Sequence, residues 1–427
     1  MMENCCFCSR HKSEVKKLVA TESADGLICD ICIETCYSIL LQDDQEEFIK
    51  NPKNLSTLTP KEIYNLLDEV IAGQEEAKKE IALVAYLHQI RVKNKDLSKN
   101  VKKSNVLIIG PSGSGKTLLL ETLGNILNLP ISFTDATTLT EVGYVGNDGD
   151  ECINKLLNKS GFYDSNIDPS TALEKTEMGI CVIDEFDKKA KRVSDNNSRD
   201  ISGESVQQMI LKLLEGNEVS LFNNNNKKNT HQEVVNVNTT NILFILSGAF
   251  EGLDKIILKS LGSNIGFNVN KSLDKNSNYE EVITHFKKEH LIKFGFIPEI
   301  IGRLPIIIFT KNLTKNNIIE ILTKKKNNII DEYKLILNYH YNSELIVKDE
   351  FIKIIADKIY NDKTGARSIR SIFNKIFRNV LFELPNIKKK ITITLDETTA
   401  NNEEAIIVFD NNQKIINDKK NLGKSLI

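Results

Sequence analysis

Short apolar runs alternate with amphipathic stretches through the middle of the chain. Three runs read as buried strands: SNVLIIG (104–110), GICVIDE (179–185) and NILFILSG (241–248). Stretches with helical periodicity include KEIYNLLDEV (61–70), QEEAKKEIALVAYLHQIRV (74–92) and KTLLLETLGNIL (116–127). Strands that are apolar on both faces and separated by helices are typical of a parallel sheet covered on both sides. Residues 61–310 therefore predict one large α/β domain.

The pattern changes after the apolar run LPIIIF (304–309). We expect helices in NIIEILTKKKNNIIDEY (317–333), DEFIKIIADKIY (349–360) and GARSIRSIFNKIFRNVLFEL (365–384), followed by strands KITITL (390–395) and AIIVF (405–409). A run of about a hundred residues is a common size for a domain. The sequence thus predicts a small, mostly helical domain at 311–412 and a tail at 413–427.

The N-terminal region has a different composition. Six of the eight cysteines lie in the first 36 residues, which predicts a compact Cys-rich unit at 1–40. The following segment, LQDDQEEFIKNPKNLSTLTP (41–60), is acidic, polar and interrupted by prolines, as linkers are.

Charge and hydropathy argue against binding to nucleic acid, to acidic surfaces and to membranes. The 427 residues carry 56 Lys and Arg against 58 Asp and Glu, so no bulk charge favours nucleic acid or an acidic surface. No apolar run is long enough to span a bilayer, and the N-terminus lacks the apolar core of a signal peptide. We expect a protein of the cytoplasm, or of an equivalent reducing and soluble compartment, that binds neither nucleic acid nor membrane.

A phosphate-binding motif follows the first predicted strand. Gly110-Pro111-Ser112-Gly113-Ser114-Gly115-Lys116-Thr117 has the pattern GxxxxGK[ST] between an apolar strand and a helix. Glycines at these positions let backbone N–H groups turn toward phosphates, the lysine reaches the β- and γ-phosphates, and the Thr117 hydroxyl helps to hold Mg²⁺. With the next residue, Leu118, this segment is the predicted ATP site; a chance glycine-rich turn is the alternative.

The second predicted strand ends in two carboxylates, Asp184 and Glu185, sixty-eight residues after Lys116. Beside a phosphate-binding loop, the first carboxylate holds the Mg²⁺ shell and the second polarises the attacking water. A strand that merely meets solvent can also end in Asp-Glu, but the pairing with the loop favours ATP hydrolysis.

The N-terminal cysteines have the spacing of a zinc site. Cys5-x₂-Cys8 and Cys29-x₂-Cys32, with twenty residues between the pairs, predict a tetrahedral Cys₄ zinc unit. Two features leave alternatives open, because Cys6 can compete with Cys5 and Cys36 lies one helical turn beyond Cys32. The cysteines can also simply be reduced thiols. The residues between the pairs lack an aromatic and basic stacking surface, which favours contacts with protein.

One exposed loop carries apolar side chains. In TEVGYVGNDGD (140–150), Tyr144 and Val145 lie between Gly143 and Gly146, and polar turn formers follow. An exposed loop ordinarily gains nothing from such side chains, so the sequence predicts either a gripping surface or a Tyr144 that packs into a neighbouring core.

The ordered set of motifs resembles the ClpX family of AAA+ protein unfoldases, from Cys5 to about residue 385. The resemblance rests on CCFC…CDIC, GPSGSGKT, DATTLTEVGYVG, VIDEFDK, RDISGESVQQMILKLLEG, ILFILSGAF, IGF, LIKFGFIPEIIGRLP and KTGARSIR. It implies a homo-hexameric ring that unfolds tagged or unfolded proteins, threads them into a ClpP-type peptidase and also acts as a chaperone. The cofactors implied are ATP, Mg²⁺ and Zn²⁺, with adaptors bound through the zinc domain.

The resemblance also implies roles for particular residues. The loop at 143–146 grips substrate in the central channel, and RDISGE (199–204) is a second pore loop. Arg303 matches the arginine finger, Arg367 matches the sensor arginine of the small domain, and the other sensor position falls near Ser247. The tripeptide Ile265-Gly266-Phe267 matches the loop that docks on the peptidase; an apolar patch that folds back on its own domain is the alternative.

The chain departs from the family at two places. Lys227-Lys228-Asn229 stands where a basic Arg-Lys-His loop is usual, and Ala72 stands where isoleucine is usual near the adenine. Two other functions remain open: a stand-alone remodelling chaperone without a peptidase, and an ATPase that depends on nucleic acid.

Overall fold

The fold is described from a computed structural model of the chain. The described residues are 5–8, 10–11, 15–20, 26–33, 57–139, 150–164, 166–191, 201–222, 234–262, 279–340, 343–362, 365–387, 390–403 and 405–409. The chain forms two compact units, Met1–Thr57 and Leu58–Ile427, and each is described by itself. In the first unit, β1 (Leu18–Ala20) pairs antiparallel with β2 (Leu27–Cys29), which carries one predicted zinc ligand at its end.

A five-stranded sheet forms the centre of the second unit. Its order is β4-β5-β8-β3-β9 and all of its pairs are parallel. The strands are β3 (Val106–Ile109), β4 (Ile131–Asp135), β5 (Ile180–Asp184), β8 (Leu243–Gly248) and β9 (Ile306–Phe309). The predicted parallel α/β domain is confirmed.

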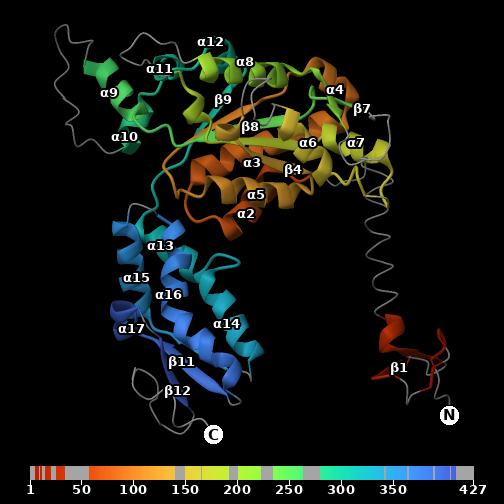
Figure 1. Cartoon of the computed structure of the whole chain (residues 1–427), viewed down its shortest axis with the longest axis vertical. Coiled ribbons are helices and arrows are strands. Elements are labelled where there is room, and N and C mark those ends of the chain that lie inside the picture. Colours follow the sequence, from red (N-terminus) through yellow and green to blue (C-terminus); the bar gives the residue numbers. More distant parts are fainter. Residues whose placement is uncertain are drawn as a thin grey trace. The chain divides into compact units, whose positions relative to one another are not determined.

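Alternating side chains of the strands face two separate cores. In β3, Val106 and Ile108 belong to the core shared with the helices α2 (Pro60–Val70), α3 (Glu75–Lys93) and α5 (Lys116–Leu127). Leu107 and Ile109 belong to the core on the opposite face. Each residue of β3 is at most 1% exposed, which explains why its sequence is a continuous apolar run. Figure 1 shows helices on both sides of this sheet.

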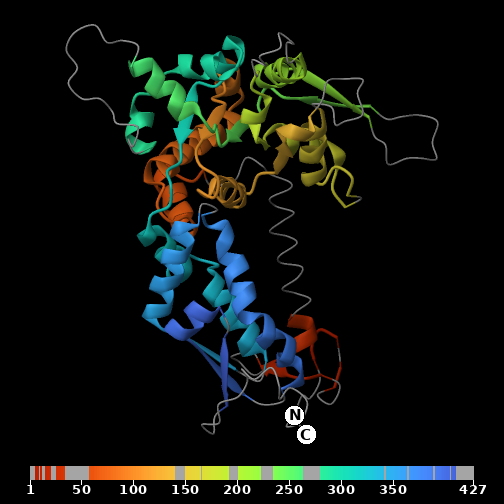
Figure 2. The same cartoon turned by 60° about the vertical axis from the view of Figure 1, so that its left-hand side comes forward.

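The second core is covered by short helices and by a hairpin. The hairpin pairs β6 (Glu218–Phe222) with β7 (Val234–Asn238), and Figure 2 shows it projecting away from the five-stranded sheet. The helices of this layer are α6 (Asp150–Lys159), α7 (Pro169–Glu177), α8 (Ile201–Glu215), α9 (Leu253–Gly262), α10 (Tyr279–Thr284), α11 (Lys288–Phe294) and α12 (Pro298–Gly302). The portion of the second unit that is built around the five-stranded sheet is called the large part. Three further short helices complete it: α4 (Lys95–Asn100), which follows α3, and the 3₁₀ turns η3 (Ala136–Thr138) and η4 (Phe186–Lys189).

The C-terminal part has its own core. Its helices are α13 (Lys315–Thr323), α14 (Ile329–Tyr339), α15 (Asp349–Asn361), α16 (Arg367–Glu383) and α17 (Glu397–Asn402), with the 3₁₀ turn η5 (Leu384–Asn386). A three-stranded sheet orders β10 (Glu344–Val347), β11 (Ile391–Leu395) and β12 (Ile406–Phe409). Aromatic rings fill the core, where Tyr333 stacks on Phe377 with 4.2 Å between ring centroids. The small, mostly helical part expected from the sequence is present.

The helical stretch expected at 317–333 is two helices rather than one. The helix is interrupted at two asparagines. Asn327 has a left-handed backbone (φ 58°), and the Asn328 side chain accepts a hydrogen bond from the Asp331 N–H and so caps a new helix, α14. The lysines between the helices contact α2 instead: Lys326 N donates to Glu69 O at 2.8 Å, and Lys325 Nζ donates to Asp68 O at 2.5 Å.

Candidate functional site

The carboxyl ends of three adjacent strands bring the predicted nucleotide residues together. The sheet order places β8 between β3 and β5, with Ile109 paired to Gly248 and Ile183 to Leu246. The phosphate-binding segment, Asp184 and Ser247 therefore lie together at the carboxyl ends of the strands. Ligands of open parallel sheets bind at this end.

The segment Gly110–Thr117 has the backbone of a phosphate cradle. Gly113 and Gly115 have positive φ angles of 76° and 92°, and α5 begins directly afterwards at Lys116. Gly110 is required for a different reason, because a Cβ there would lie 2.0 Å from Thr310 Oγ1. The Ser114 and Thr310 hydroxyls are 2.8 Å apart, which fixes the cradle to the residue after β9.

Lys116 bends back over the cradle. Its Nζ donates to Gly110 O at 2.7 Å and to Pro111 O at 3.0 Å. Burial lowers the pKa of Lys116, while the nearby Asp184 and Asp187 carboxylates act in the opposite direction. A partly buried cation that is held by neutral carbonyls is suited to exchange them for phosphate oxygens.

Asp184 is held by its neighbours at the end of β5. The Ser247 hydroxyl and the Glu185 N–H, the latter at 2.9 Å, both donate to Asp184 Oδ1. Ser247 thus contacts the carboxylate predicted to hold Mg²⁺, at the position where the sequence placed a sensor. Asp187 accepts from Ala249 N at 3.2 Å, which joins the turn after β5 to the end of β8.

The C-terminal part reaches the cradle through a glycine turn. A Cβ built on Gly365 would lie 3.3 Å from Gly113 O, so this turn packs directly on the cradle backbone. Arg367, two residues later, begins α16 and contributes to the lowered pKa of Lys116. The structure thus brings Arg367 within electrostatic range of the predicted nucleotide site.

Gln74 is a site residue that the sequence analysis did not identify. Its Nε2 donates to Ser114 O at 3.2 Å and to Lys311 O at 2.8 Å, and its Oε1 accepts from Lys311 N at 2.9 Å. One amide thus joins the cradle to the segment that leaves the sheet. Its left-handed backbone (φ 59°) is a signal that only the structure provides.

Arg303 lies apart from this cluster. It caps α12, and its Nε and Nη2 donate to Glu215 Oε1 at 3.2 and 2.8 Å. Its carbonyl accepts from the Asn105 side chain, which directly precedes β3. Since the cradle follows the other end of β3, Arg303 and the nucleotide site of the same chain lie at opposite ends of that strand.

Several predicted residues lie outside the described part of the chain. They are the loop Gly143–Gly146, the first residues of RDISGE (199–200), Ile265-Gly266-Phe267, Lys227-Lys228-Asn229, Cys36 and the tail 413–427.

The four predicted zinc ligands converge. The sulfurs of Cys5, Cys8, Cys29 and Cys32 all lie within 4.8 Å of one another. The Cys5–Cys32 and Cys8–Cys29 pairs are 3.9 and 3.6 Å apart, close to the roughly 3.8 Å edge of a tetrahedron with Zn–S bonds of about 2.3 Å. Cys6 is exposed and accepts from Leu27 N at 3.3 Å, outside this cluster. The four sulfurs fit a tetrahedral zinc ion.

Comparison with known proteins gives matches along nearly the whole chain. Residues 3–42 match the family described as ClpX C4-type zinc finger, 101–307 the AAA domain (Cdc48 subfamily), and 313–397 the C-terminal, D2-small domain, of ClpB protein. The "ATP-dependent Clp protease ATP-binding subunit ClpX" of Borrelia duttonii (strain Ly) is 37% identical over 420 residues, which are 95% of this chain and 93% of the relative. The protein of the same name from Borrelia recurrentis (strain A1) matches equally. The chain belongs to the ClpX family.

Family membership assigns the two centres in this chain. As a ClpX-type AAA+ ATPase, it binds ATP, and the P-loop cradle lies within the matched AAA region. The Cys₄ cluster lies within the matched ClpX zinc finger, which supports Zn²⁺ as its metal. In the part of the chain that the structure describes, no helix has the length and apolar character needed to cross a bilayer.

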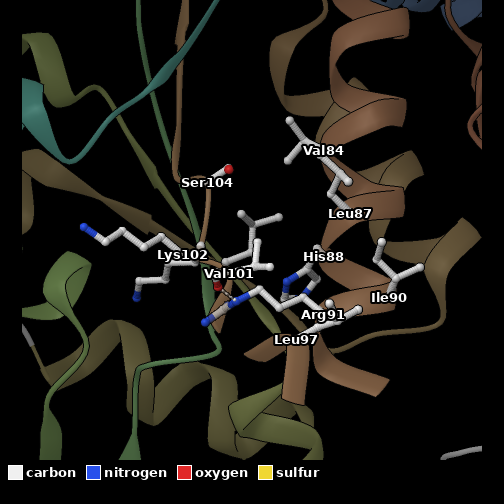
Figure 3. A pocket seen from close by; sticks show the side chains of 11 residues that line it. Val84, Leu87, His88, Ile90, Arg91, Leu97, Val101, Lys102 and Ser104 are labelled. Carbon is white, nitrogen blue, oxygen red and sulfur yellow. Dashed lines mark hydrogen bonds between the residues drawn. The ribbon is translucent and has the colours of Figure 1, made fainter. Parts of the chain in front are cut away.

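This ClpX-family chain also has a cavity away from the cradle. Its volume is about 180 Å³, and it lies between α3, the segment after α4 and the start of β3 (Figure 3). His88 lines it and is 2.8 Å from Met178 O, while Arg91 Nε donates to Val101 O at 2.8 Å. Burial lowers the pKa of His88 to about 4, so its ring is neutral. The cavity shares no residue with the nucleotide site.

Proposed function

We propose that this ClpX-family chain is an ATP-dependent protein unfoldase that threads substrates into a ClpP-type peptidase and also acts as a chaperone. One observation carries the proposal. Lys116, Asp184 and Ser247 converge at the carboxyl ends of β3, β5 and β8, in a chain that aligns over 95% of its length with ClpX proteins. The relatives' name includes "Clp protease", which supports a peptidase partner.

The proposed chemistry at the cradle is phosphoryl transfer to water. Residues 110–118 would hold the ATP phosphates, and Thr117 and Asp184 would hold Mg²⁺, which neutralises charge that develops on the phosphate oxygens. Glu185 would orient the attacking water. It is exposed and has a left-handed backbone (φ 54°), a strained conformation that is concentrated at active sites.

Two arginines complete the proposed site. Arg367 would contact the nucleotide from the C-terminal part and couple its state to the angle between the two parts. Arg303 would act on the nucleotide of a neighbouring copy in a homo-hexameric ring, which its attachment at the opposite end of β3 supports. Hydrolysis would then depend on assembly.

The proposed grip on substrate is the segment Gly143-Tyr144-Val145-Gly146, with 199–204 as a second pore loop. An aromatic and a branched aliphatic side chain contact any polypeptide without requiring a particular sequence. A contact just before residues 143–146 supports coupling of this grip to hydrolysis. Lys189 Nζ donates to Leu139 O at 2.9 Å, and Lys189 lies only four residues after Glu185.

The proposed partners are proteins. Ile265-Gly266-Phe267 would dock on the peptidase, and the zinc unit would bind substrates or adaptors. Exposed apolar side chains on that unit, including Phe7 at 69% and Ile31 at 41%, support protein contacts. We place the protein in the cytoplasm or an equivalent reducing compartment, which suits zinc thiolates and free thiols.

Two substitutions test the proposal. Glu185→Gln is expected to abolish hydrolysis while ATP binding and ring assembly persist, because it removes the group that activates water and keeps the side-chain shape. Tyr144→Ala is expected to keep hydrolysis but abolish unfolding of a tagged fluorescent protein, and Tyr144→Phe is the matched control that retains the ring. Normal unfolding by Tyr144→Ala would show that the grip is elsewhere.

The two other candidate functions have separate readouts. Capture of a ClpP-type peptidase in the presence of ATP, lost in a Phe267→Ala variant, distinguishes a protease subunit from a stand-alone chaperone. Stimulation of the ATPase by unfolded protein rather than by DNA distinguishes an unfoldase from a nucleic-acid-dependent ATPase.

A further inference from the structure

Arg303 is held by one carboxylate at the surface of the large part. Its Nε and Nη2 both donate to Glu215 Oε1, and the two side chains are 47% and 40% exposed. An ion pair this exposed contributes little to stability. The pair therefore matters for where it holds the guanidinium and contributes little to the fold.

Glu215 stands on a fixed support. It is the last residue of α8, and the carbonyls just before it are bonded from the segment that leads into β3. Leu213 O accepts from Lys103 Nζ at 3.3 Å, and Leu214 O accepts from Asn105 Nδ2 at 3.3 Å. These contacts satisfy carbonyls that a helix end leaves unpaired. The end of α8 is thus anchored to the central sheet.

A glutamate at the end of a helix is unfavourable by itself. The helix dipole places negative partial charge there, and a carboxylate adds to it. The Arg303 guanidinium supplies compensating positive charge at the same helix end. A residue that breaks a local rule and is compensated nearby is expected where function requires it.

The backbone of Arg303 is tied to the same support. Asn105 Nδ2 donates to Arg303 O at 3.2 Å as well as to Leu214 O, and Asn105 is only 2% exposed. One buried amide therefore fixes both the arginine backbone and the helix end that carries its carboxylate partner. The position of the guanidinium is thus determined by its own backbone and by its carboxylate partner, and Asn105 fixes both.

We propose that Glu215 is a positioning residue for Arg303. The Glu215 carboxylate holds the Nε and Nη2 edge of the guanidinium, so that the rest of the guanidinium faces the nucleotide of the neighbouring copy. The inference rests on the proposed role of Arg303 as the arginine finger. The pair with Glu215 uses two of the five N–H donors of the guanidinium, and a phosphate oxygen needs only one or two of the others. Holding one edge lowers the entropy that the long side chain loses when it engages phosphate.

The test compares steady-state ATP hydrolysis by full-length rings. Glu215→Ala is expected to lower kcat about tenfold, a part of the roughly thousandfold or more that an arginine finger supplies, with KM for ATP unchanged. Glu215→Gln keeps an acceptor oxygen and is expected to recover at least half of the loss. In an Arg303→Ala background, Glu215→Ala is expected to have no further effect. Ring assembly of each variant is checked by sedimentation with a slowly hydrolysed ATP analogue.

The matched control is Glu332→Ala. It breaks a similar exposed pair on the C-terminal part, in which Arg370 Nη1 and Nη2 donate to Glu332 at 3.0 and 2.7 Å, and it is expected to leave kcat unchanged. An unchanged or raised kcat in Glu215→Ala, or an equal loss with Arg303 already removed, overturns the positioning role while the finger role stands. Normal hydrolysis by Arg303→Ala alone overturns both.

Discussion

The neutral His88 gives this protein a stability that depends on pH. Burial lowers its pKa from 6.5 to about 4, and the positive charges of Arg91 and Lys103 act in the same direction. An unfolded chain binds a proton at His88 below about pH 6.5, whereas the folded chain resists the proton until about pH 4. The stability that the neutral ring contributes is therefore fully present above pH 6.5 and is lost as the pH falls toward 4.

The size of this effect follows from the shift. A change of about 2.5 pKa units corresponds to about 3 kcal/mol of unfolding free energy, a large part of the stability of an ordinary domain. His88→Gln keeps a side-chain N–H for Met178 O and removes the titration. We expect the stability difference between the wild-type chain and this variant to shrink by about 3 kcal/mol between pH 7 and pH 4.

The assay is urea unfolding followed by circular dichroism at several pH values, for the wild-type chain, His88→Gln and His285→Gln. His285 is exposed, so its variant is the matched control and is expected to follow the wild-type chain at every pH. Taking differences between variants cancels acid effects on the zinc unit and on the carboxylates. A constant difference between the wild-type chain and His88→Gln across this range would refute a neutral, buried His88.

Three further predictions concern the two centres. Gly110→Ala is expected to weaken ATP binding at least tenfold. The added Cβ would lie 2.0 Å from Thr310 Oγ1, and such overpacking costs about 1–3 kcal/mol. Fluorescent-nucleotide titration measures the affinity, and a wild-type affinity would contradict the close approach. Gln74→Ala is expected to raise KM for ATP, since it releases the cradle from Lys311. The control is Gln89→Ala, in the helix α3 that directly follows Gln74, and an unchanged KM in Gln74→Ala would show that the bridge is dispensable. Cys29→Ser is expected to abolish stoichiometric zinc binding, as measured with a chromogenic chelator, and to leave the basal ATPase intact; retained zinc would refute the ligand set.

The sequence predicts the sheet well where strands are buried on both faces. The apolar runs of β3, β5 and β8 leave no ambiguity, because both of their faces meet a core. It does not reveal β10, whose apolar run is only three residues long (345–347) and whose positions alternate between exposed and half-buried. Strand β4 is missed for a related reason, since ISFTD at the sheet edge mixes polar and apolar residues.

The site shows the same division. Lys116 and Asp184 belong to local motifs, so that their types and spacing suffice to identify them. Gln74 bonds to a residue 237 positions away, and the Arg303–Glu215 pair joins residues 88 positions apart. Such pairings arise from tertiary packing, and no local pattern in a single sequence encodes them.

The close approach of Gly110 to Thr310 has a mechanical consequence. Thr310 is the residue directly after β9, and the backbone of the next residue, Lys311, is hydrogen-bonded to the Gln74 side chain. The connection toward the C-terminal part thus starts in van der Waals contact with the cradle itself, with no slack chain between them. Any change in the backbone position of the cradle would therefore be passed directly to the start of the connection that leads to the C-terminal part.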